Sequence, residues 1–308
     1  MNDIDWKKFT YVDYLNCEDN EVKNLPPGVN ISTMCGNCKL NTKFNITNIE
    51  HYLPLNKNDI ISVKVSNDRM RTLIKPKIKK RRTKKNTVVK TTSNPFYNQI
   101  TVVVRIKEGE CEDLAQEKKI NLKLFKNGTI QISGLKNVKY CNRAINKLLL
   151  RLKQSKAIKE NENITEIKFI EDIDDELSIS NFNIYMINSN YKIQYHINRA
   201  ALYKLLIMKK IKCSYEKTIR ACVIVKYVPE INNEEEKEIS IFIFEKGNII
   251  ITGARNLDHI SCSYKYINNI LLNHIDEIIM ANSEENDKLI FELYTKIITD
   301  EKHKLKNI

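Results

Sequence analysis

Two phenylalanines, Phe125 and Phe244, occupy the same place in two copies of a short sequence pattern. The segments FKNGTIQISGLKN at 125–137 and FEKGNIIITGARN at 244–256 share six of thirteen residues. Successive side chains of a strand point to opposite faces, so the alternation assigns one apolar face of each hairpin to the core. These predicted core residues are Leu122, Leu124, Ile130, Ile132, Ile241, Ile243, Ile249 and Ile251. Both phenylalanines are therefore predicted to lie on the face opposite the core.

The side chains that share this second face suit a nucleic-acid surface. Apolar rings can enter between base steps, hydroxyl groups can bond to base-edge acceptors, and cations can contact phosphates. The predicted contact residues are Phe125, Gln131, Ser133, Phe242, Phe244, Ile250 and Thr252, together with Arg105 and Lys226 at matching places on the preceding strands. A covering layer of helices or a partner subunit is the alternative explanation for rings on this face.

A repeat of a larger unit positions the two hairpins. The strand ITVVVRI at 100–106 matches ACVIVKY at 221–227, and KFNITNIEHYL at 43–53 matches YHINRAALYKLL at 195–206. Each copy is predicted to run strand, helix, three strands, helix, with a glycine of positive φ in the hairpin turn. Two such copies predict an α+β fold, in which helices pack on one face of an antiparallel sheet.

The net charge of +13 is concentrated in one segment. Residues 66–95 hold eleven Lys or Arg against one Asp, and aligning Ile46 with Ile197 makes this segment an insertion into the first copy. The simplest interpretation is a solvated loop, and the alternatives are an electrostatic DNA clamp or a nuclear localisation patch. Residues 154–177, with eight Asp or Glu against three Lys, are predicted to form an acidic linker.

The sequence predicts an intracellular protein. No segment has the ~20 consecutive apolar residues that span a bilayer, and the amino terminus MNDIDWKKF does not resemble a signal peptide. We therefore expect neither membrane insertion nor secretion, and reduced cysteines. Apolar residues at helical spacing between 283 and 305 predict a carboxy-terminal helix.

Residue patterns for catalysis or metal binding are sparse. The motif Cys35-Gly-Asn-Cys38 lies on a predicted strand and has no second ligand pair at a suitable spacing. The five histidines are scattered, and no Ser-His-Asp or carboxylate cluster can be recognised. We expect a binding protein that is not an enzyme and that needs no metal or other cofactor.

The hairpin pattern resembles the TATA-box-binding protein family. FEKGNIIITGARN, followed by an amphipathic helix, is similar to the family's Phe-x-x-Gly-x-hydrophobic-x-x-Thr-Gly-Ala-Lys segment, and NPFYNQITVVVRI resembles the strand before it. The insertion and composition are most similar to the TATA-binding-protein-like proteins of large DNA viruses. The resemblance implies a saddle in which two pseudo-symmetric repeats, 29–153 and 178–275, share one curved antiparallel sheet with helices on the convex face. Residues 1–28 and 276–308 would be extensions of this fold.

The resemblance also implies a function. The concave face would bind, and bend, A·T-rich double-stranded DNA through the minor groove, where A·T pairs present only hydrogen-bond acceptors. The protein would act as a monomer on DNA and recruit a B-type transcription initiation factor and the RNA polymerase machinery. Its place of action would be the nucleus or a cytoplasmic viral factory.

The family's contact positions fall on residues that the strand alternation had already selected. The resemblance assigns inserting rings to Phe125 and Phe244, base-edge hydroxyls to Ser133 and Thr252, neighbouring base contacts to Gln131 and Ile250, and phosphate contacts to Arg105 and Lys226. Gln131 departs from the family's apolar residue there. Tyr215 and Glu216 resemble a Tyr-Glu pair that meets the B-type factor in the family.

Other family positions are altered or ambiguous. The family has a second inserting phenylalanine in each half, and strict counting places these positions at Gln99 and Arg220. A shift of the alignment would instead place Phe96 or Tyr97 there in the first half, or Ile219 in the second.

The two central asparagines of the family are also ambiguous. One matches Asn30, and the second half places Met186 at the other site with Asn188 two residues on. The internal repeat instead pairs Asn30 with Asn181 and Asn37 with Asn188, so both alignments stay open.

Two further functions remain possible from the sequence. The chain could be a divergent interaction scaffold with weak or no DNA binding, which the residues at 99 and 220 favour. It could also be the recognition domain of a DNA-processing complex.

Overall fold

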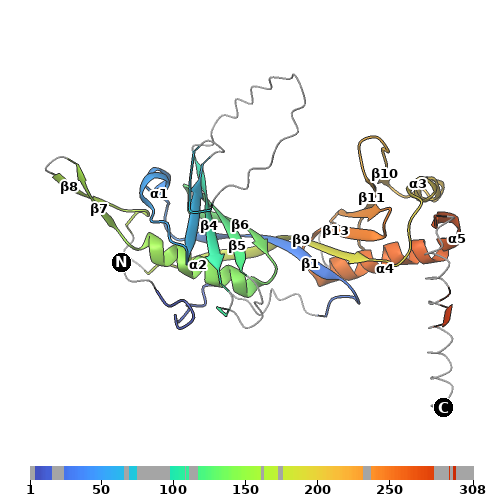
Figure 1. The fold of residues 1–308 in the computed structure, drawn as a ribbon, viewed down its shortest axis with the longest axis horizontal. Coiled ribbons are helices and arrows are strands. Elements are labelled where there is room, and N and C mark those ends of the chain that lie inside the picture. Colours follow the sequence, from blue (N-terminus) through green and yellow to red (C-terminus); the bar gives the residue numbers. More distant parts are fainter. Residues whose placement is uncertain are drawn as a thin grey trace, which may run out of the picture. The chain divides into compact units, whose positions relative to one another are not determined.

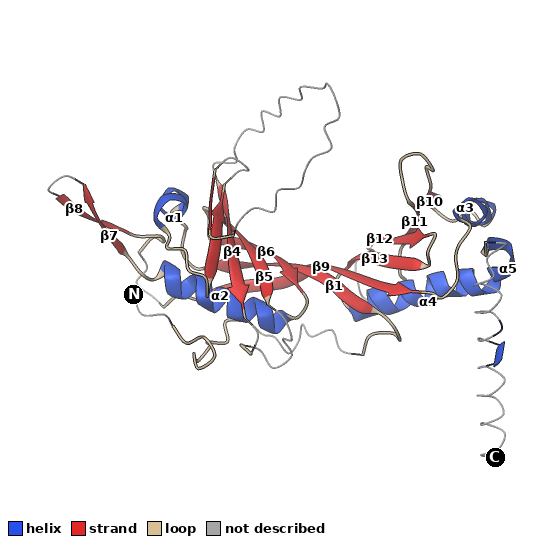
Figure 2. Ribbon diagram, in the orientation of Figure 1, coloured by secondary structure: helices blue, strands red, loops and turns tan. Residues whose placement is uncertain are grey.

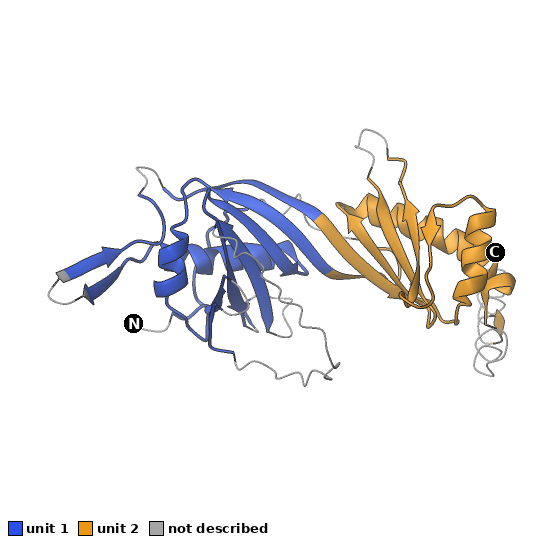
Figure 3. Ribbon diagram, turned by 90° about the horizontal axis from the view of Figure 1, so that it is seen from above, with its two compact units in different colours: residues 1–21, 33–185 blue, residues 22–32, 186–308 orange. Residues whose placement is uncertain are grey.

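The computed structural model describes residues 4–15, 24–65, 69–74, 98–107, 109–110, 117–160, 163–172, 176–231, 237–280, 291 and 294–295. Strands and helices follow one another in the same order twice along the chain (Figures 1 and 2). Two compact units result, residues 1–21 with 33–185 as unit 1 and residues 22–32 with 186–308 as unit 2 (Figure 3).

Unit 1 carries the first copy of the repeat. Its elements are β1 (Asn30–Leu40), α1 (Ile46–Tyr52), β2 (Ile60–Lys64), β3 (Met70–Thr72), β4 (Gln99–Ile106), β5 (Lys118–Phe125), β6 (Thr129–Leu135), α2 (Val138–Leu152), β7 (Lys156–Glu160) and β8 (Asn163–Ile167). The strand order is β9-β1-β6-β5-β4-β2-β3, and β7 pairs with β8 alone.

Unit 2 carries the second copy. Its elements are β9 (Ile179–Lys192), α3 (Arg199–Met208), β10 (Cys213–Ser214), β11 (Cys222–Tyr227), β12 (Ile239–Phe244), β13 (Asn248–Ala254), α4 (Leu257–Asn273) and α5 (Ile275–Ile278). The strand order is β10-β11-β12-β13-β9-β1, so β1 and β9 contribute to both units. The predicted α+β class, with an antiparallel sheet and helices on one face, is confirmed.

The alternation of the hairpins determines which face is covered. All eight predicted core residues of the two hairpins are 0% exposed. The long helices α2 and α4 pack on the strands of their own units from this side (Figure 2). Two residues at the turns, Gly128 and Gly247, have φ of 89° and 76°, as predicted. A side chain at either glycine would also collide with a backbone carbonyl, that of Thr42 or of Ile193.

The last residue of the repeated pattern caps a helix in each copy. The Asn137 side chain accepts a hydrogen bond of 2.7 Å from the Lys139 N–H at the start of α2. Asn256 accepts one of 2.9 Å from His259 N–H at the start of α4. Asparagine is among the preferred residues here because its side-chain oxygen satisfies an N–H that lacks a partner within the helix.

We expect Asn137→Ala to lower the free energy of unfolding by about 1 kcal/mol, since the capping bond is lost. Urea denaturation followed by circular dichroism would measure this change. Asn137→Ser is the control, because serine keeps a capping oxygen; an equal loss in both variants would contradict a capping role.

Several segments differ from the sequence-based expectation. The first copy contains two more strands than predicted, β2 and β3, and the second contains one more, β10; all three are short. Part of the basic insertion is also structured: β3 pairs with β2, and Arg71 donates to the carbonyls of Ile49, Glu50 and Leu53 at the end of α1. Residues 75–97 lie outside the described residues.

The segments before and after the first copy are also structured: the first packs on α2, and the second forms a hairpin. The predicted acidic linker contains the hairpin of β7 and β8. In the amino-terminal extension, Val12 N–H donates to Asn146 at 2.8 Å and Tyr14 N–H donates to Asn142 at 3.2 Å. Trp6 is buried as well, so the described part of this extension packs on the outer side of α2.

Candidate nucleic-acid interface

In unit 2, the predicted contact residues lie together on the face that α4 leaves uncovered. Phe242, Phe244, Ile250 and Thr252 are half-buried, whereas their neighbours on the other face are fully buried. Thr252 lies opposite Asn188 of β9, and its hydroxyl donates to the Asn188 side-chain oxygen. The pattern of alternating faces therefore predicted the exposed face of this hairpin correctly.

A hollow lies beside Phe244 in unit 2. Its volume is about 560 Å³, which is in the range of small-ligand sites. It is lined by Gly28, Asn30, Asn190, Tyr191, Lys192, Phe244, Asn248 and Ile250. The predicted residues Asn30, Phe244 and Ile250 thus come together from three strands, and three asparagines line the same hollow.

The matching face of unit 1 has different chemistry. Phe125, Gln131 and Ser133 are half-buried on it, and the Gln131 side-chain amide donates to the Tyr185 hydroxyl at 2.7 Å. A hollow of 440 Å³ beside Phe125 is lined by Lys43, Asn98, Phe125, Lys126 and Asn127. Two lysines therefore lie near this ring, where unit 2 presents asparagines and one lysine.

The two predicted phosphate-binding cations do not match in strand register. Arg105 lies opposite Lys119, six residues before Phe125, whereas Lys226 lies opposite Ser240, four residues before Phe244. The predicted match is therefore wrong by two residues.

The backbone N–H of Arg105 donates to the Asp59 carbonyl, and that of Lys226 donates to the Lys212 carbonyl. Arg105 forms an ion pair with Glu117 at 3.2 Å.

Lys226 is held in a similar way. It forms an ion pair with Glu238 at 3.0 Å and donates to the Ser240 hydroxyl at 2.8 Å. Hydrogen bonds from Lys212 and Lys226 lower the pKa of the Glu238 carboxyl, so the acid stays ionised beside the cation.

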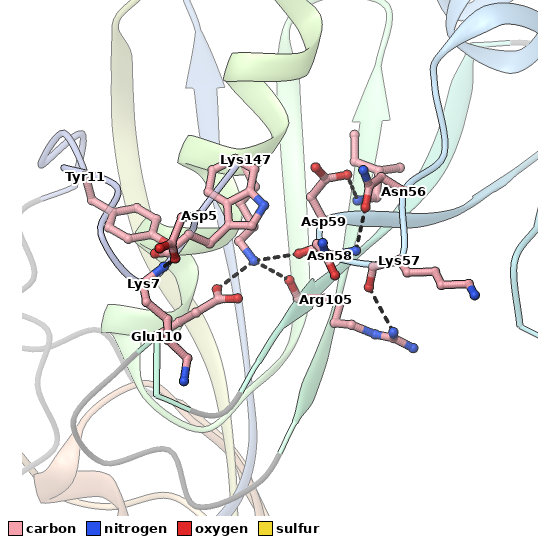
Figure 4. Close-up of polar contacts among 12 residues, drawn as sticks. Asp5, Lys7, Tyr11, Asn56, Lys57, Asn58, Asp59, Arg105, Glu110 and Lys147 are labelled. Carbon is pink, nitrogen blue, oxygen red and sulfur yellow. Dashed lines mark hydrogen bonds and ion pairs between the residues drawn. The ribbon is translucent and has the colours of Figure 1, made fainter. Parts of the chain in front are cut away.

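A buried lysine supports the strand end that carries Arg105 (Figure 4). The Lys147 ammonium donates to the Arg105 carbonyl at 2.8 Å and to the Asn58 carbonyl at 3.0 Å, and it pairs with Glu110 at 2.6 Å. Burial lowers the pKa of Lys147, and the Glu110 carboxylate opposes that effect. The sequence alone did not indicate this arrangement, because its members are distant in the chain.

Strand pairing settles the alignment of the asparagines. Asn37 lies opposite Gln131, and Asn190 lies opposite Ile250. Since Gln131 and Ile250 are equivalent in the repeat, Asn37 matches Asn190. The predicted matches of Asn37 with Asn188 and of Asn30 with Asn181 are therefore wrong by two residues.

The same register corrects the remaining first-strand matches. Cys35, opposite Ser133, takes the place of Asn188, which is opposite Thr252. On the helix side, Phe44 N–H bonds to the Lys126 carbonyl as Ile197 N–H bonds to the Glu245 carbonyl. Ile197 thus matches Phe44 and not Ile46.

On the preceding strand, the residue opposite each predicted inserting phenylalanine is not aromatic. Gln99 lies opposite Phe125, and Cys222 lies opposite Phe244 in place of the predicted Arg220. Ile219 is 80% exposed in the turn before β11. Phe96 and Tyr97 lie outside the described residues.

Of the predicted partner-binding residues, Tyr215 packs against neighbouring side chains and Glu216 is exposed. The Tyr215 ring packs near Tyr203 of α3, with ring centroids 6.0 Å apart, and the Arg199 guanidinium lies 5.7 Å from its centre. Glu216 is exposed and accepts from the Thr218 hydroxyl at 2.9 Å. Tyr215 thus anchors the loop, and Glu216 is accessible on it.

The two cysteines of the CxxC motif lie on opposite faces of β1. Cys35 pairs with Ser133 on the uncovered face, and Cys38 pairs with Ile130 of the core face. Burial raises the pKa of the Cys38 thiol to about 12. Both observations oppose a shared metal ion or thiolate chemistry, and no metal-binding cluster occurs among the described residues.

Sequence reasoning missed three polar residues near the predicted contact residues: Tyr185 in unit 1, and Asn190 and Asn248 in unit 2. Tyr185 accepts the hydrogen bond from Gln131. Strand pairing places the two asparagines, since Asn190 lies opposite Ile250 and Asn248 lies opposite Lys192. A signal was present in the sequence, because Asn190 is two residues from Asn188 and so shares its face.

No helix within the described part of the chain is long and apolar enough to cross a membrane.

A sequence relative agrees with the resemblance of the hairpin motif. The chain is 32% identical over 276 residues to a protein named TATA-box-binding protein-like from Acanthamoeba polyphaga mimivirus, covering 84% of this chain and 69% of that protein. Among solved structures it is similar to Methanococcus jannaschii TBP, with a TM-score of 0.44, 14% identity, and coverage of 78% of this chain and 96% of that chain. No protein-family model matches the chain.

Proposed function

The chain belongs to the TATA-box-binding protein family, and we propose that it is a transcription initiation factor that binds and bends A·T-rich DNA through the minor groove. The main support is the uncovered sheet face of each unit, which presents one phenylalanine at the hairpin turn, a hydroxyl four strand positions inward and a basic residue on the neighbouring strand. Rings can enter between base steps while the cations hold the phosphates. The role is binding, not catalysis.

Titration of short duplexes tests this proposal. Saturable binding that weakens with salt and favours A·T-rich over G·C-rich DNA is expected, together with a bend measured by fluorescence energy transfer between the duplex ends. Equal affinity for all sequences without a bend would reject it.

The proposed phosphate contact of Lys226 can be measured separately. Lys226→Gln should weaken binding to all duplexes by a similar factor and reduce the slope of log K against log salt by about 1, because one phosphate contact is lost. Lys265→Gln is the matched control, since Lys265 is exposed on α4, which packs on the other face. An effect that depends on the base sequence would contradict a phosphate role.

The proposed partners are a B-type initiation factor and the polymerase machinery, with Glu216 as an accessible contact. The protein would act as a monomer on DNA, inside the nucleus or a cytoplasmic viral factory. The basic insertion at 66–95 would add electrostatic contacts to the DNA backbone.

A scaffold function with weak DNA binding is the second candidate. The observation that favours it is the pairing of Gln99 and Cys222 with the two phenylalanines, which leaves neither ring an aromatic neighbour on that strand. Capture of initiation factors by a wild-type protein that shifts no DNA duplex would support this candidate.

A further inference from the structure

We propose that the hollow beside Phe244 accepts the amino group of a guanine in the DNA minor groove, through the side-chain oxygen of Asn190. This inference rests on the proposed DNA binding and adds to it a base preference in one half of the protein. The asparagines of the hollow, Asn30, Asn190 and Asn248, carry the argument.

The chemistry follows from what each base pair presents in the minor groove. A·T pairs offer only acceptors, whereas a G·C pair adds the guanine amino group, which is a donor. An apolar sheet face offers that group no hydrogen-bond acceptor. An amide oxygen can accept a hydrogen bond from it.

Contacts across β1, β9 and β13 orient two amides differently. The Asn190 amide nitrogen donates to the Ser32 hydroxyl at 2.7 Å, which leaves its oxygen directed to other donors. The Asn188 oxygen instead accepts from the Thr252 hydroxyl, which leaves its amide nitrogen to donate. The face therefore offers a donor at Asn188 for the acceptors of any base pair, and an acceptor at Asn190 for an amino group.

The exposure of Asn190 and the residues beside it support its role as the acceptor for the guanine amino group. Asn190 is exposed, and the residue opposite it, Ile250, has no polar side-chain atom. Lys192, two residues along the strand, also lines the hollow and can hold a phosphate at its edge.

Unit 1 lacks this arrangement. Cys35 replaces Asn188, and Asn37 replaces Asn190 without a side chain among the described residues that orients its amide. The hollow beside Phe125 is lined by Lys43 and Lys126, which suit phosphates and not base edges. The preference is therefore assigned to unit 2.

Base analogues separate the amino group from the rest of the base pair. A·T and inosine·cytosine pairs lack a minor-groove amino group, whereas G·C and 2,6-diaminopurine·T pairs carry one. Each pair is placed in turn at every position of one A·T-rich duplex, and the affinity of the full-length chain is measured. At one position, both amino-bearing pairs should bind about fivefold more tightly than both pairs without the group, as expected for one added hydrogen bond.

Asn190→Leu, which keeps a similar side-chain volume, should abolish the preference at that position, whereas Asn37→Leu should leave it unchanged. Amino groups that weaken binding equally at all positions, in the wild type and in Asn190→Leu alike, would overturn the inference and leave the proposed function intact. If no duplex is bound at all, the proposed function itself fails.

Discussion

Phe244→Ala is expected to weaken binding of an A·T-rich duplex by about thirtyfold and to reduce the bend. Removing an aromatic ring that stacks on a base costs about 2 kcal/mol, which corresponds to this factor. Phe244 lies at the end of β12 beside the hollow, where a base step can reach it. The measurements are affinity by fluorescence anisotropy and bending by energy transfer between the duplex ends.

Phe242→Ala is the matched control on the same strand. Phe242 lies opposite Ile224 and Ile250, two residues before the end of β12, and does not line the hollow. Its loss should weaken binding less and leave the bend close to that of the wild type. Equal small effects of the two substitutions, with unchanged circular dichroism, would refute the inserting role of Phe244.

The fold class could be predicted because its determinants are local. Alternating residues from Leu122 to Ile132 specify a buried face whatever lies beside the strand, and the residues at the turns specify the hairpin. The same alternation placed Phe125 and Phe244 correctly on the uncovered face.

The register of the first strand in each copy could not be predicted. Strand β9 has polar residues on both sides of its alternation, as in NSNYK at 188–192, so a slip of two residues leaves its pattern nearly unchanged. Irregular pairing at Met34/Cys35 and at Thr252/Ala254 displaces the register further. The orientation of Asn190 depends on Ser32, which is 158 residues away in the chain.

The burial of two charged residues of α2 could not be predicted from the sequence either. Lys147 and Arg151 fall on an amphipathic helix, where long cations usually reach solvent, yet both are buried. Their partners, Glu110 and Asp59, lie on loops outside the helix. Residues 4–15 help to exclude water, because Trp6 covers Lys147 with the ammonium 4.8 Å from its ring centre.

Asp59 forms hydrogen bonds through both its side chain and its backbone. One carboxylate oxygen accepts two bonds from the Arg151 guanidinium, of 3.0 and 2.5 Å, and the other accepts from Ile60 N–H. Its backbone carbonyl accepts from the N–H of Arg105. A single buried acid therefore connects α2, the start of β2 and the strand that carries the proposed phosphate contact.

Asp59→Ala should lower the free energy of unfolding by about 3 to 5 kcal/mol, because it leaves the buried Arg151 guanidinium without its counter-charge. Glu171→Ala is the control: its ion pair with Lys43 is exposed to solvent, and its loss should cost less than about 1 kcal/mol. Urea denaturation of both variants measures the difference. If Asp59→Ala unfolds at the same urea concentration as Glu171→Ala, the pair with Arg151 does not stabilise unit 1.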